Sequence, residues 1–220
     1  MNARTLLVVL CLLACNRLQA QPVLVRVQVV DRVLTSDSTE VQTAAHGLVQ
    51  ISMIRFYLSE LRLVRNGTIV WRDSLQAHLI DLRKPEQNNL FLPDHQPDDS
   101  LYFRFGTDSL LNVSGALSGD LDPSKGMYWT WNSGYINCKI EGRSERSVAL
   151  DHQLEYHLGG YLPPNTTSRE VRLLAGKTLV LDLREFLESI KPGQFPTVTA
   201  PGPEAVRLCE VLARSFRMIP

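Results

Sequence analysis

The residues best suited to binding a metal ion lie in two short segments of the chain. One segment begins at Met127 and contains Trp129 and Trp131, which are two of the three tryptophans. If this segment is a strand, these three side chains share a face, because side chains alternate along a strand. The other segment contains His157, which directly precedes a pair of glycines. Imidazole nitrogen and thioether sulfur can both bind metal ions, so the two segments are candidates for a metal site.

The same residues also have simpler interpretations. Trp129 and Trp131 beside glycine-rich turns can form a packed aromatic corner of the core. His157 can be a histidine that is hydrogen-bonded near a turn. His46 lies in a polar segment before an apolar strand and could supply a second imidazole, although only its chemistry recommends it.

The composition excludes several other classes of function. The 23 basic residues equal the 23 acidic residues, and no basic stripe is present, which argues against a nucleic-acid partner. The sequence contains no GxSxG, HExxH or phosphate-loop pattern. We therefore expect a protein that is not an enzyme.

The elements that must position these residues are short strands. Residues 49–64 alternate between apolar and polar side chains, with a change of face between Leu58 and Leu61 that predicts a β-bulge. Asn66-Gly67 then predicts a hairpin, because both residues tolerate positive φ. Further strands are expected at 23–30, 68–71, 78–82, 89–92, 101–105, 135–141, 152–158, 169–174 and 178–183.

Helices are expected to be few. Residues 184–190 predict one or two helical turns, and residues 204–216 place apolar side chains at helical spacing. Many short strands with regular turn signals favour an all-β fold. We expect a single domain over residues 21–220, an antiparallel β-sandwich of the Ig-like or Greek-key type with a short C-terminal helix.

Two cysteines lie in this domain. Cys138 alternates with apolar residues of an expected strand, and Cys209 lies on the apolar side of the last helix. Two buried core thiols and one disulfide that joins helix to sheet are both consistent with this pattern.

Residues 1–20 have the features of an export signal. Arg4 precedes an apolar run from Leu6 to Ala14 that is too short to span a membrane, since spanning takes about 20 residues. Residues 12–15 have the form of a lipobox that would make Cys15 a lipid anchor, whereas cleavage after Ala20 would release the protein. Both alternatives stay open, and in either case the protein is expected in the periplasm or on the outer surface. Contact with a membrane is expected only through such an anchor.

Four blocks of the sequence resemble one known family. Residues 126–135, GMYWTWNSGY, resemble the signature of the methanobactin-associated copper-binding (MbnP-like) family. Residues 54–59, residues 105–115 and residues 156–161 are similar to three other blocks of that family, in the same order. The similarity extends over nearly the whole of the expected domain.

The resemblance implies a copper-binding β-sandwich outside the cytoplasm. In relatives, a di-haem enzyme of the cytochrome-c-peroxidase type oxidises one tryptophan of the motif to kynurenine, whose amine binds copper beside histidine. On this sequence the candidates for oxidation are Trp129 and Trp131, and the candidate histidine is His157. Some relatives have a histidine two residues after the modified tryptophan, whereas this chain has Trp131 there.

Two functional hypotheses follow. In the first, the protein binds copper through His157 and a kynurenine, with Met127 as a soft ligand and His46 as a further imidazole. In the second, it is a metal-free scaffold or interaction module outside the cytoplasm, in which the tryptophan corner is only core.

Overall fold

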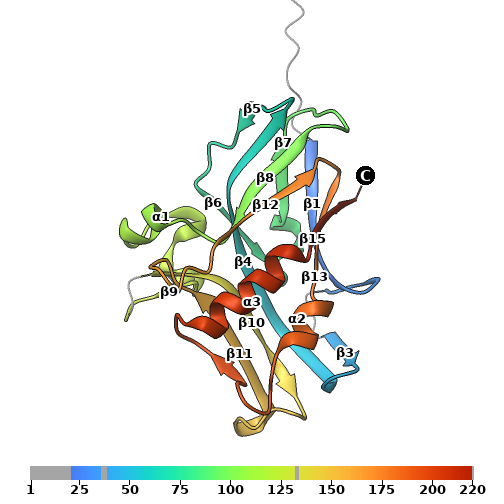
Figure 1. The fold of residues 1–220 in the computed structure, drawn as a ribbon, viewed down its shortest axis with the longest axis vertical. Helices are drawn as coiled ribbons and strands as arrows, with labels where there is room; N and C mark the ends of the chain where they lie inside the picture. The colour runs from blue at the N-terminus through green and yellow to red at the C-terminus, as the bar shows by residue number, and fades with distance from the viewer. Residues whose placement is uncertain (1–20, 36–38, 132–133, 220) are drawn as a thin grey trace, which may run out of the picture.

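The computed structural model describes residues 21–35, 39–131 and 134–219. The expected export signal lies outside the described residues. Two sheets pack face to face and only a few helices accompany them (Figure 1), which confirms the prediction of an all-β sandwich. No described helix has the length and apolar character that crossing a membrane requires.

The larger sheet is organised around one long strand, β4 (Gly47–Arg65), which runs through most of the length of the molecule in Figure 1. Its strand order is β12–β8–β4–β10–β11–β14, with β3, β5 and β6 also paired to β4 and β9 paired to β10. The other strands are β3 (Thr39–Thr43), β5 (Thr68–Arg72), β6 (Ala77–Asp81), β8 (Ser100–Phe105), β9 (Tyr128–Trp129), β10 (Gly134–Ser144), β11 (Gln153–Gly159), β12 (Arg169–Leu174) and β14 (Thr197–Val198).

The smaller sheet covers the apolar face of the larger one. Its order is β15–β13–β1–β2, and β7 also pairs with β1. The strands are β1 (Gln21–Val29), β2 (Arg32–Val33), β7 (Asn89–Leu92), β13 (Thr178–Asp182) and β15 (Phe216–Ile219). The sandwich is not wholly antiparallel, because β1 pairs with β13, and β11 with β14, in parallel.

The helices fill the remaining edges of the core. The α-helices are α1 (Ser109–Val113), α2 (Arg184–Ser189) and α3 (Pro203–Arg214), and the 3-10 turns are η1 (Pro85–Gln87), η2 (Gly119–Leu121), η3 (Pro123–Lys125) and η4 (Leu150–His152). The expected last helix ends two residues earlier than predicted, and Phe216 begins β15 instead. Helix α1 lies outside the two segments for which helices were expected.

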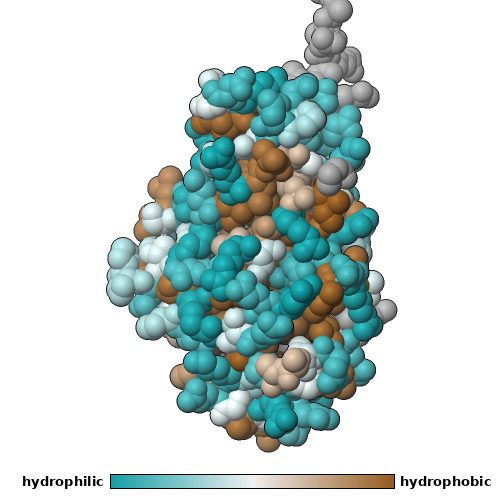
Figure 2. Space-filling view, turned by 45° about the vertical axis from the view of Figure 1, so that its right-hand side comes forward, coloured by the Kyte–Doolittle hydropathy of each residue, from teal (hydrophilic) through white to brown (hydrophobic). Residues whose placement is uncertain are grey.

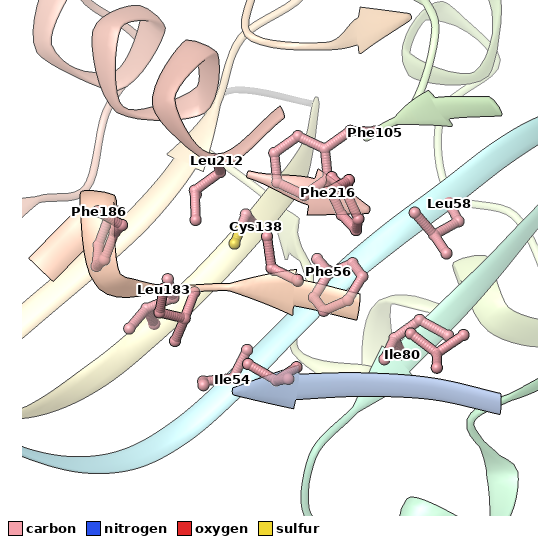
Figure 3. Close-up of a cluster of buried hydrophobic side chains, with 14 of the residues drawn as sticks. Ile54, Phe56, Leu58, Ile80, Phe105, Cys138, Leu183, Phe186, Leu212 and Phe216 are labelled. Carbon is pink, nitrogen blue, oxygen red and sulfur yellow. The ribbon is translucent and has the colours of Figure 1, made fainter. Parts of the chain in front are cut away.

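The main core lies between the sheets, where aromatic rings from both layers meet (Figure 3). The ring of Phe216 from the smaller sheet lies 5.9 Å from that of Phe56 and 5.4 Å from that of Phe105, measured between centroids. Leu212 of α3 and Phe186 of α2 close the same core. The face of the molecule drawn in Figure 2 is mostly polar, with apolar residues in separate groups.

The local signals in β4 are confirmed. The register between β4 and β8 shifts between Ser59 and Arg62, and Glu60 has a φ of 53°. Asn66 and Gly67 have positive φ and join β4 to β5 as predicted. A second register shift, which the sequence did not indicate, occurs opposite Gly142 of β10.

The two cysteines of the domain are free thiols. Cys138 of β10 and Cys209 of α3 are both completely buried in the main core. Burial raises the pKa of Cys138 well above its usual range and that of Cys209 to about 12. Both therefore behave as small apolar residues, as in the first of the two alternatives above.

We predict that Phe216→Ala lowers the free energy of unfolding by about 3–5 kcal/mol, because it removes a buried ring and leaves a cavity between the sheets. Denaturant unfolding measures this change. Phe91→Ala is the matched control, since the Phe91 side chain is 61% exposed. A loss of equal size in both variants would contradict the role of Phe216 as the junction between the two sheets.

Candidate functional site

The tryptophan motif forms a short hairpin at the start of β10, beside the middle of β4. Gly126 ends the turn η3 with a φ of 71°, a left-handed conformation that favours glycine. Strand β9 follows and pairs Trp129 with Gly134 at the start of β10. Figure 1 shows β9 and α1 on the same side of the molecule. The hairpin thus sits on the face of the sheet that points away from the main core.

A second, smaller core holds this hairpin against the sheet. Met127 is completely buried and Trp129 is 6% exposed. The remaining buried members of this core are Tyr57, Ala77, Leu111, Leu121, Tyr135 and Ile136. The interpretation of the motif as an aromatic corner is therefore correct for Met127, whose sulfur lies among apolar side chains.

The two tryptophans have different environments. Their ring centroids are 5.5 Å apart and their planes are inclined by 41°. Trp129 is buried against the sheet, whereas Trp131 is 64% exposed. The pair therefore connects the second core to the molecular surface.

Trp129 packs directly on the strand that carries His157. A Cβ atom added to Gly159 would lie 2.7 Å from Cζ3 of Trp129, so the indole occupies the space of the missing side chain. Side chains of His157 and Gly159 would point to the same face of β11, since residues two apart do so. The neighbours of His157 in the chain, Tyr156 and Leu158, point into the main core. The structure thus brings Trp129 to the face of the sheet that carries His157.

His157 is held by a carboxylate from the neighbouring strand. Its Nε2 atom lies 2.9 Å from Oε1 of Glu141, and Nζ of Lys139 lies 3.3 Å from the same oxygen. The hydrogen bond with His157, and after it the charge of Lys139, lower the pKa of Glu141 to about 2 against the opposing effect of burial. The carboxylate is therefore ionised at neutral pH.

The register of the two strands places the imidazole between two partners. His157 is opposite Lys139, and Glu155 is opposite Glu141. Glu141 therefore lies on the side of His157 toward residue 155, while Trp129 lies on the side toward Gly159. The order along this face is carboxylate, imidazole, indole.

His46 is far from this group. It precedes β4, whose Val49 pairs with Ser144 at the end of β10, whereas Trp129 pairs with Gly134 at its start. His157 pairs with Lys139, five residues before Ser144, so about 3.3 Å per residue puts roughly 16 Å between the level of His157 and the pair of Val49 with Ser144, and His46 lies beyond that pair. His46 instead packs near the end of α2, where burial lowers its pKa. The structure does not bring it together with His157.

A buried network of hydrogen bonds fixes the backbone around the site. Oδ1 of Asn137 in β10 accepts hydrogen bonds from the backbone N and from Oγ1 of Thr107, at 2.8 and 2.9 Å. Nδ2 of Asn137 donates to Oγ1 of Thr167, which donates to the carbonyl of Gly160. Nδ2 of Asn112 donates to Oγ1 of Thr107, and Oδ1 of Asn112 accepts from the backbone N–H of Tyr135 at 2.7 Å.

Sequence analysis missed two residues of this arrangement. Asn137, Lys139 and Glu141 are polar and alternate with apolar residues along β10. This alternation was the available signal. The pairing of Glu141 with His157 depends on the register of two strands, which the sequence does not encode locally.

Comparison with known proteins decides the family. The model of the MbnP family matches residues 23–200. The chain belongs to the MbnP family. The structure is also similar to MbnP from Methylosinus trichosporium, with a TM-score of 0.63, 15% sequence identity and coverage of 86% of each chain. No curated protein sequence gives a significant match.

Two of the sequence blocks that resemble the MbnP family contact each other beside this hairpin. Tyr57 of the first block donates to the carbonyl of Asp120, and its own carbonyl accepts from Gly106 of the second block at 2.8 Å. Gly106 has a φ of 97°, and an added Cβ would lie 2.6 Å from Cγ of Asn137. These two blocks therefore form part of one connected scaffold around Trp129 and His157.

We predict that Gly159→Ala displaces the indole of Trp129 and lowers the free energy of unfolding by about 1–3 kcal/mol, since the new methyl group overlaps both the ring and the carbonyl of Tyr135. Tryptophan emission and denaturant unfolding measure the two effects. Gly193→Ala is the control, because its Cβ would meet its nearest atom at 3.9 Å and should leave both quantities nearly unchanged. An unaltered emission spectrum in Gly159→Ala would refute the packing described here.

We predict that Asn137→Leu costs at least about 1–3 kcal/mol of unfolding free energy, because it leaves the buried backbone N–H of Thr107 without its acceptor. Gln153→Leu, an exposed change on the same sheet, should stay within about 0.5 kcal/mol of the wild type. Equal stability of the two variants would show that the network does not anchor the site.

Proposed function

We propose that the protein binds copper outside the cytoplasm through His157 and a modified Trp129. The observation that carries this proposal is the packing of Trp129 on Gly159, beside His157 on one face of β11. Membership of the MbnP family, which is associated with methanobactin and copper, supports a copper-related role.

The described residues supply a histidine with a carboxylate partner, but they do not supply a full set of metal ligands. Metal-binding histidines commonly donate their second N–H to a carboxylate, as His157 can to Glu141. Among the residues that the structure describes, no group of three or more His, Cys, Asp or Glu could hold a metal ion. His157 therefore needs a donor of another kind, and a modified indole would supply it.

Oxidation of Trp129 to kynurenine would provide that donor. Two peroxide equivalents add two oxygen atoms across the Cγ–Cδ1 bond, open the five-membered ring and leave two molecules of water. Hydrolysis then releases formate and frees an aromatic amine at the former Nε1 atom. We assign the change to Trp129, because it packs on the strand that carries His157, whereas Trp131 is mostly exposed. Trp131, left intact, would cover the site and limit the access of water.

The oxidant in this proposal is a di-haem enzyme of the cytochrome-c-peroxidase type. Trp131 is the part of the tryptophan pair that such a partner could contact, since it is 64% exposed. The reaction would take place in the periplasm or on the outer surface, after export through residues 1–20, with Cys15 as a membrane anchor if it is lipidated. The chain itself would act as a binding protein and not as an enzyme.

A metal-free scaffold is the second candidate function. The complete burial of Met127 and the burial of Trp129 favour it, because both side chains already serve as core of the hairpin. In this case the exposed Trp131 would be a contact for a partner. The burial of Met127 also removes it from the ligands that we propose for copper.

We predict that protein produced in the periplasm together with its di-haem partner enzyme carries kynurenine at Trp129 and binds copper. Peptide mass spectrometry should show that this residue has gained one oxygen atom and lost one carbon atom. Trp129→Phe should abolish binding, His157→Ala should weaken it at least tenfold, and Trp131→Phe should keep a large part of it.

The control is His95→Ala, a loop histidine that contacts the carbonyl of Pro93 and should leave copper uptake unchanged. Intact tryptophan at position 129 together with no copper uptake would favour the scaffold. Modification of Trp131 with Trp129 intact would refute the assignment of the modified residue.

A further inference from the structure

The orientation of the His157 ring follows from its partner on β10. Oε1 of Glu141 lies 2.9 Å from Nε2 of His157, which is hydrogen-bond distance. An ionised carboxylate only accepts hydrogen bonds, so Nε2 must carry the proton. In the neutral imidazole this leaves the lone pair on Nδ1.

The position of Glu141 is set by the backbone around it. The register between β10 and β4 shifts between Glu141 and Gly142. A Cβ atom added to Gly142 would lie 2.2 Å from the carbonyl oxygen of Gln50, so only glycine permits this approach of the two strands. The Glu141 carboxylate also forms an ion pair with the ammonium group of Lys139, at 3.3 Å. This ion pair holds the carboxylate on the face of the sheet that carries His157. Glu141 is thus fixed from three directions before any metal is present.

We propose that Glu141 is the positioning residue of the site, which fixes His157 as the Nε2–H tautomer and presents Nδ1 as the atom that binds the metal. The binding of a metal by Nδ1 rests on the proposed copper function, whereas the tautomer of His157 does not. Glu141 does not contact the metal in this arrangement, because it bonds Nε2 of His157, whereas the metal would bind Nδ1 of the same ring. It acts through the imidazole alone.

The neighbouring carboxylate provides a matched control. Glu155 is directly opposite Glu141 in the ladder and belongs to the same face of the sheet. Both side chains line one open hollow of about 380 Å³ on this face. Glu155→Gln therefore removes the same charge from the same surface, while the hydrogen bond between Glu141 and His157 stays in place.

The test begins with the metal-free, unmodified protein. Two-bond ¹H–¹⁵N correlation spectra of the histidine rings distinguish the two neutral tautomers, and they require neither copper nor kynurenine. We expect His157 to be the Nε2–H tautomer in the wild type and in Glu155→Gln. In Glu141→Gln, an amide that both donates and accepts replaces the carboxylate, and the Nδ1–H tautomer should become populated.

Copper titration of the kynurenine-containing protein completes the test. Glu141→Gln should bind copper about 10–100-fold more weakly than the wild type, as is typical when the partner of a metal-binding histidine is removed. Glu155→Gln should keep the wild-type affinity. Denaturant unfolding of both variants shows whether the fold is intact. If Glu141→Gln is as stable as Glu155→Gln but binds copper more weakly, the result supports a positioning role for Glu141.

The outcomes separate the two proposals. Failure of the wild type to bind copper overturns the proposed function and leaves the tautomer measurement to stand by itself. An Nδ1–H tautomer in the wild type, or equal copper affinity in Glu141→Gln and the wild type, overturns the role of Glu141.

Discussion

The candidate site depends on the buried side-chain amide of Asn137. Near the start of β10 the chain leaves regular strand pairing. Backbone groups that would otherwise bond a neighbouring strand must find other hydrogen-bond partners there. Asn137 bonds Thr107 on one side and Thr167 on the other, and so connects three segments that are distant in sequence. Such a network is rigid when every member is satisfied and costly when one is missing. The position of Trp129 on β11 follows from this constraint.

The site has two supports of different kinds. The amide network holds the backbone that carries Trp129, whereas the register of β10 with β11 places Glu141 beside His157. The first support is buried and neutral, so pH should not affect it. The second is a charged pair at the border of solvent, since the Glu141 side chain is 27% exposed. Stability of the hairpin and orientation of the imidazole are therefore separable properties.

Local sequence signals were sufficient for the fold and insufficient for the site. The alternation in β4, its bulge near Glu60 and the Asn66-Gly67 turn are encoded by neighbouring residues, and the structure confirms them. The parallel pairing of β1 with β13 joins segments that lie about 150 residues apart, so no local pattern could indicate it. The same limit explains Glu141 and His46. Glu141 joins the site only through strand register, and His46 is excluded from it only by its place in the turn before β4.

The arrangement explains how a side chain could be chemically altered without loss of the fold. Trp129 is held through its backbone, by the pairing of β9 with Gly134, and through its six-membered ring, which lies on Gly159. Opening the five-membered ring changes neither of these contacts, because kynurenine keeps the backbone and the six-membered ring. Trp131 lies exposed beside Trp129, and His157 lies on the same face of β11 as Gly159. In the proposed function the second core would thus be the rigid floor of a site whose reactive part is formed after folding.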